Sequence, residues 1–90
     1  MEVSMTTAEA EILALKALAF LANSEDGLNR LCNASGLNAG DLRAQAGEPE
    51  TLAAILDFLL QNEELLVAFC DDATIDPRAV HRAAYRLATP

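Results

Sequence analysis

The chain has little sulfur, few aromatic side chains and no tryptophan. Its 90 residues include two cysteines, three phenylalanines and one tyrosine. Two cysteines are too few for the disulfide scaffold of many small secreted domains, so a reducing compartment is expected. β-Branched residues are also scarce, whereas alanine and leucine supply most of the 52% apolar residues. Because alanine and leucine are good helix formers, this composition favours an all-α fold and argues against disorder.

Basic residues are few as well, with six against fourteen acids and a net charge of −8. The negative electrostatic field of such a protein disfavours general binding to nucleic acid and to anionic membranes. The apolar stretch 12–22 is shorter than the roughly 20 residues of a membrane span. It is preceded by Glu2, Glu9 and Glu11, where a signal peptide would carry lysine or arginine. We therefore expect a cytoplasmic protein without a membrane partner.

Groups for catalysis or metal binding are missing. The chain has one histidine, His81, and no glycine-rich phosphate loop, whereas a catalytic site needs several converging polar groups. Two cysteines far apart in the sequence and one histidine do not complete a zinc ligand set. The acids show no calcium-loop spacing. We therefore expect no enzymatic activity, no metal site and no cofactor.

Helix caps and breakers predict six helices and no strands. Thr6 and Glu9 form a capping-box pattern before the first helix, and Asp76-Pro77 is the clearest helix start. The expected helices cover about 7–22, 25–35, 39–46, 49–61, 63–72 and 77–87, with Ser24, Asn38 and Asn62 as further caps and Gly36 and Gly47 as ends. The expected fold is an all-α compact bundle of five to six helices in one domain, residues 1–90.

The sequence also contains a candidate internal repeat. An alignment without gaps pairs 12–46 with 50–84 and matches Phe20 to Phe58 and Cys32 to Cys70. Caps fall on caps and apolar residues on apolar residues, which favours a duplicated three-helix unit. Because only a minority of the aligned pairs are identical, chance similarity between helices stays an alternative.

The first and fourth helices are apolar nearly all round, with Lys16 and Asp57 as the only charges in 12–22 and 51–60. Such helices are buried on most sides, so we expect them to form a central pair covered by shorter helices. A domain of 90 residues has little material to cover both. Any uncovered apolar face would bind a partner or a second copy, so a homodimer is considered.

Three segments carry the apolar and polar pattern of the chain: 13–22, Gly36-Leu37 followed by Asp41-Leu42-Arg43, and 52–69. With these motifs the chain resembles a family of short bacterial proteins described as a domain of unknown function. The resemblance covers roughly residues 8–87. It implies a structural similarity but supplies no activity and no site residues.

Two residue pairs admit two interpretations each. Cys32 and Cys70 are expected to be small buried hydrophobes, with a redox pair or a disulfide between the two repeats as the alternative. Lys16 and Asp57 are expected to reach solvent separately, with a buried ion pair as the alternative.

The C-terminal segment 63–87 has the outline of a helix-turn-helix. Arg78, Arg82 and Arg86 recur at every fourth position and form one stripe beside His81, so they are the candidate interaction residues. They could contact nucleic acid, or they could pair with an acidic partner and the helix dipole. The net charge disfavours the first interpretation. The favoured function is therefore a small protein–protein interaction or regulatory module, with nucleic-acid binding through 63–87 as the alternative.

Overall fold

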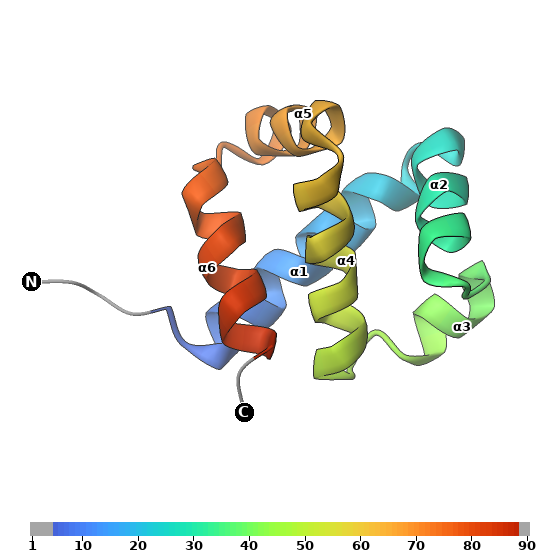
Figure 1. The fold of residues 1–90 in the computed structure, drawn as a ribbon, viewed down its shortest axis with the longest axis horizontal. Coiled ribbons are helices and arrows are strands. Elements are labelled where there is room, and N and C mark those ends of the chain that lie inside the picture. Colours follow the sequence, from blue (N-terminus) through green and yellow to red (C-terminus); the bar gives the residue numbers. More distant parts are fainter. Residues whose placement is uncertain (1–4, 89–90) are drawn as a thin grey trace, which may run out of the picture.

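A computed structural model describes residues 5–88, and these residues form an all-α bundle (Figure 1). No strand occurs within this range. The prediction of an all-α fold is therefore confirmed. The helices are α1 (Thr7–Ala22), α2 (Glu25–Ser35), α3 (Ala39–Ala44), α4 (Pro49–Gln61), α5 (Glu63–Ala73) and α6 (Pro77–Ala88).

Most helix starts use the caps that the sequence predicts. Thr6 and Glu9 form a reciprocal capping box, and Ser24 and Asn38 accept bonds from the backbone N–H groups of Gly27 and Asp41. Asn62 is an exception, because its side chain donates to the Phe58 carbonyl instead of capping α5. The third helix is also shorter than predicted, since it ends at Ala44 and a turn follows.

The bundle has two layers over its central part. α1 crosses behind α4 and α6, while α2 and α3 lie at one side of the bundle and α5 lies across one end (Figure 1). The residues fully or almost fully buried between the layers include Ala10, Ala14, Ala17, Leu21, Leu52, Ile55, Leu56, Leu59, Val80 and Ala83. α6 is therefore a third core helix beside the predicted central pair, because its apolar residues recur at helical spacing and pack on both α1 and α4.

The two candidate repeats agree in their local structure. When the repeats are aligned, the bounds of α2 coincide with those of α5, and both helices end at a left-handed residue, Gly36 and Thr74. The third helices differ, since α3 has 6 residues and α6 has 12. Of these two helices, only α6 packs extensively on both α1 and α4. The two candidate repeats are therefore not equivalent in the core. The duplication itself stays a prediction.

Thr74 is a candidate for stabilisation, because it is a β-branched residue with φ 54° and ψ 52°. This conformation costs most residues about 1–2 kcal/mol, and glycine adopts it without steric strain. After the entropy of glycine is subtracted, Thr74→Gly is expected to raise the free energy of unfolding by about 0.5–1 kcal/mol. Thermal unfolding followed by circular dichroism measures the change. Ala73→Gly, inside α5, should lower the melting temperature, and a lower value for Thr74→Gly would contradict the prediction.

The capping box of α1 makes stability depend on pH. The Glu9 carboxylate accepts a hydrogen bond from the Thr6 backbone N–H at 2.8 Å, and this contact and the Thr6 side chain hold the pKa of Glu9 below its ordinary 4.5. A lowered pKa stabilises the folded state above the unfolded-state value and loses this contribution as the pH falls. Glu9→Gln keeps the capping geometry without the charge. The stability difference between wild type and Glu9→Gln should therefore shrink between about pH 6 and pH 3, as measured by urea unfolding. A constant difference would contradict this assignment.

Candidate functional site

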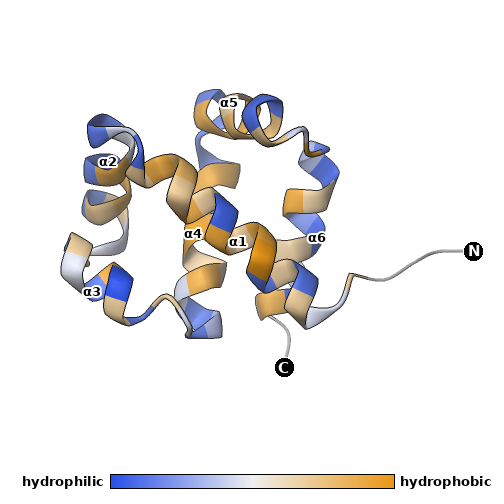
Figure 2. Cartoon of the chain, turned by 180° about the vertical axis from the view of Figure 1, so that it is seen from behind, coloured by the Kyte–Doolittle hydropathy of each residue, from blue (hydrophilic) through white to orange (hydrophobic). Residues whose placement is uncertain are grey.

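The outward side of α1 is apolar along its length. Ile12 is 54% exposed and Leu15 is 44% exposed, although both are large hydrophobic residues. Between Ala10 and Ala22, every exposed residue of α1 is apolar except Lys16. Figure 2 shows α1 crossing the front of this side of the molecule, with hydrophobic turns along it. We define the α1 outer face by five apolar residues on this side of the helix, which are Ala8, Ile12, Leu15, Ala19 and Ala22.

The spacing of the α1 outer face is that of a helix-packing seam. Its residues follow one another at intervals of four, three, four and three, which is the repeat by which two helices pack together. The face extends over about 21 Å of helix axis at the rise of an α-helix. The opposite side of α1 is already used by the core through Leu13, Ala14 and Ala17. α1 therefore presents two apolar faces, and only one of them is covered by the described residues.

Two positions of the α1 outer face have charged counterparts in α4. When the candidate repeats are aligned, Ile12 and Ala19 of α1 correspond to Glu50 and Asp57 of α4. Both of these acids are exposed. α4 thus carries charges at two of the corresponding positions, whereas Leu15 and Ala22 correspond to the half-buried Ala53 and Leu60. The alignment therefore gives no folding reason for an apolar residue at Ile12 or Ala19.

A shallow groove runs beside the α1 outer face. Its volume is about 350 Å³, and it separates α1 from the start of α6. Glu9, Ile12 and Lys16 line the α1 side, and Ile75, Asp76 and Ala79 line the other. Glu9 and Lys16 therefore lie on the same flank of the seam, with apolar side chains between them.

The candidate residues Arg78, His81, Arg82 and Arg86 are brought together on the exposed side of α6, as the sequence predicts. We call them the α6 basic face. Tyr85, 74% exposed, lies on the same side of the helix. The helix-turn-helix outline is also present, because α5 ends at the left-handed Thr74 and α6 begins soon afterwards at Pro77.

Two arginines of the α6 basic face make contacts within the chain. The Arg78 guanidinium lies 3.0 Å from the Asp76 carboxylate, and this hydrogen-bonded pair lowers the pKa of Asp76. Nε of Arg86 donates to the Thr7 hydroxyl at 3.2 Å, which links α6 to the start of α1. Both contacts are exposed, so an external anion could compete with them.

Both cysteines are free thiols, Cys70 buried and Cys32 half-buried. Burial, followed by the negative charges of Asp71 and Asp76, raises the pKa of the Cys70 thiol. Because the thiolate is the reactive form, this environment makes Cys70 less reactive. The position of Cys70 matches the interpretation as a small buried hydrophobe.

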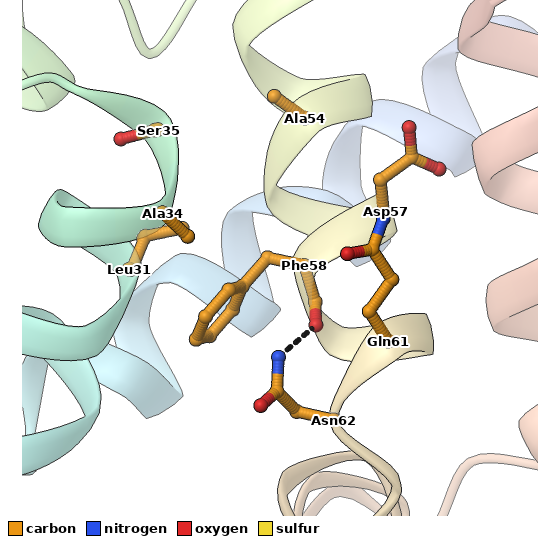
Figure 3. A pocket seen from close by; sticks show the side chains of 8 residues that line it. All are labelled: Leu31, Ala34, Ser35, Ala54, Asp57, Phe58, Gln61 and Asn62. Carbon is orange, nitrogen blue, oxygen red and sulfur yellow. Dashed lines mark hydrogen bonds between the residues drawn. The ribbon is translucent and has the colours of Figure 1, made fainter.

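Asp57 lines a pocket of about 250 Å³ between α2 and α4, and its surroundings do not form a polar site. Figure 3 shows Phe58 pointing toward Leu31 and Ala34 of α2, whereas Asp57 and Gln61 lie on the far side of Phe58 from α2. The polar groups thus diverge and do not converge on one point. Asp57 is exposed, as is Lys16, so the alternative of a buried Lys16–Asp57 pair is wrong.

From the sequence, any uncovered apolar face was expected to bind a partner, but no such face was located. The spacing of Ile12, Leu15 and Ala19 was a usable signal, but Leu13, Ala14 and Ala17 are also apolar and hide it. Within residues 5–88, no cluster of histidine, cysteine or acidic residues is arranged to hold a metal ion. None of the helices described is long and apolar enough to cross a membrane.

Comparison with known proteins gives one result. No curated protein and no solved structure matches the chain significantly. A family model, described as protein of unknown function (DUF3572), matches residues 7–90, which span all six helices. The chain therefore belongs to the DUF3572 family, and the resemblance seen in its sequence is confirmed.

Proposed function

We propose that the protein is a non-enzymatic interaction module that binds a helix of a partner protein through the α1 outer face. The observation that carries the proposal is the exposure of Ile12 and Leu15 within a continuous seam of helix-packing residues. Contiguous exposed apolar patches often mark protein interaction sites. Covering the exposed half of each large side chain would contribute about 1 kcal/mol per residue.

The proposal is tested by capture of partners with the tagged full-length chain from its source cells. The double variant Ile12→Gln with Leu15→Gln removes the apolar seam, and both positions are exposed, so the fold should be kept. The matched control is Val67→Gln, because Val67 is 49% exposed on α5 and lies outside the seam. A stoichiometric partner bound by wild type and the control, but lost with the double variant, supports the proposal. Retention of that partner by the double variant would contradict it.

A second candidate function is nucleic-acid binding through the unit 63–87. It is favoured by the four side chains of the α6 basic face and by the short turn between α5 and α6. The net charge of −8 and the internal contacts of Arg78 and Arg86 weigh against it. This function is therefore placed second.

Fluorescence anisotropy with a labelled DNA duplex tests the second function. Binding at low salt that weakens steeply as salt rises, and that is lost in Arg82→Glu, would support it. Arg43→Glu, at an exposed position of α3, is the charge-matched control. If the wild type does not bind the duplex at low salt, this function is excluded.

A further inference from the structure

We infer that the helix bound to the α1 outer face is α1 of a second copy of this chain, paired antiparallel about a twofold axis. The inference rests on the proposed function and specifies its partner. It is carried by two properties of α1, namely a seam that is complementary to itself and a flank on which the exposed Lys16 and the exposed Glu9 can pair between two reversed copies.

The seam is complementary to itself when one copy is reversed. If Ile12 lies opposite Leu15 of the second copy, the twofold axis creates the same pair twice. The same register places Ala8 opposite Ala19 of the second copy, again twice. Two layers of large side chains are then flanked by layers of alanine, which allow the helix axes to approach closely.

The flanking charges fit the same register. Lys16 is exposed and has no ion-pair partner among residues 5–88. Glu9 lies two helical turns earlier on the same flank, in the groove that both side chains line. In the antiparallel pair, Lys16 of each copy faces Glu9 of the other. Such rim pairs contribute little affinity, but they fix orientation and register.

A parallel pairing fits less well. It would place Lys16 beside Glu11 of the second copy, and Glu11 is already half-buried within its own chain. It would also align the two helix dipoles in the same direction, whereas the antiparallel pair sets each positive end beside a negative one. Both orientations pair Lys16 with a glutamate, and the exposure of Glu9 and the helix dipoles favour the antiparallel one.

Analytical ultracentrifugation of the full chain, from about 10 µM to about 1 mM, tests the inference. The wild type should shift from one mass of 9.6 kDa toward twice that mass. Leu15→Gln should raise the dissociation constant at least about tenfold, because the twofold axis doubles each loss. Val67→Gln should leave it unchanged. A wild type that stays monomeric over the whole range overturns the inference.

Complementary charge variants test the orientation. Lys16→Glu alone and Glu9→Lys alone each place like charges together in the antiparallel pair and should dimerise less than wild type. An equimolar mixture of the two restores opposite-charge contacts, so it should form a mixed dimer. Circular dichroism confirms that Glu9→Lys, which alters the capping box, stays folded. A mixture that associates no better than its components overturns the antiparallel pairing.

The outcomes separate this inference from the proposed function. A monomeric wild type whose captured partner is lost on replacing Ile12 and Leu15 leaves the α1 outer face as a binding site, but for another protein. A monomeric wild type whose captured proteins are insensitive to those replacements overturns both proposals.

Discussion

Replacing Phe69 by alanine is expected to remove about 3–5 kcal/mol from the free energy of unfolding. Phe69 is 1% exposed, and its ring lies 5.5 Å from that of Phe20, centroid to centroid, with a tilt of 58°. This aromatic contact packs α5 against α1. The change would remove a buried aromatic side chain, its ring contact and the packing of neighbours around the new cavity. A domain of this size has about 5–13 kcal/mol of stability in total, so the loss is a large part of it.

Urea unfolding followed by far-UV circular dichroism measures this loss. Val67→Ala is the matched control, because Val67 lies on the same helix but is 49% exposed. It should change the free energy of unfolding by less than about 0.5 kcal/mol. A loss below about 1 kcal/mol for Phe69→Ala would mean that α5 does not contribute to the cooperative core.

Replacing Val80 by aspartate is expected to abolish stable folding at neutral pH. Val80 is fully buried in α6, at the layer contact with α1 and α4. An unpaired carboxylate there must either be desolvated or take up a proton, and the cost exceeds about 4 kcal/mol. Because burial raises the pKa of such a carboxyl group, the penalty should be smallest at acidic pH and grow as the pH rises.

His81→Asp is the control, because it places the same side chain at the next position of the same helix, where it is exposed. Far-UV circular dichroism and thermal melts of both variants decide the comparison. Cooperative melting of Val80→Asp near the wild-type temperature would show that α6 is an appendage and not a core helix. If Val80→Asp unfolds the protein and His81→Asp does not, one side of α6 packs in the core and the other side carries the α6 basic face.

This double use of α6 constrains its proposed roles. The buried residues Val80 and Leu87 fix the helix against the bundle, so the α6 basic face has a set orientation relative to α1. Arg86 reaches Thr7 at the start of α1, close to the seam that we propose for self-association. Changes in the α6 basic face should therefore be made at Arg82, because no hydrogen bond or salt bridge is seen for its side chain within residues 5–88.

The amino-acid sequence by itself determined the helices of this protein. Their starts depend on contacts between residues two or three positions apart, such as those of Thr6 with Glu9 and of Asp76 with Arg78. Gly36 ends α2 through its own backbone freedom. Interactions of such short range can be read from local patterns because no distant residue alters them. Asn62 is the instructive exception, since its side-chain oxygen accepts a bond from Arg30 on another helix.

Only the tertiary structure decided which face of α1 is exposed. Leu13 and Leu15 are both leucines of one apolar helix, but the first is 7% exposed and the second 44%. The hydrophobic effect is non-directional. An apolar residue therefore favours burial, but its identity does not indicate which neighbouring element will cover it. The choice depends on where α4 and α6 cross α1, and those crossings join segments that are distant in the chain. The local pattern therefore contained the spacing of the candidate binding face, but it did not indicate which side of α1 is exposed.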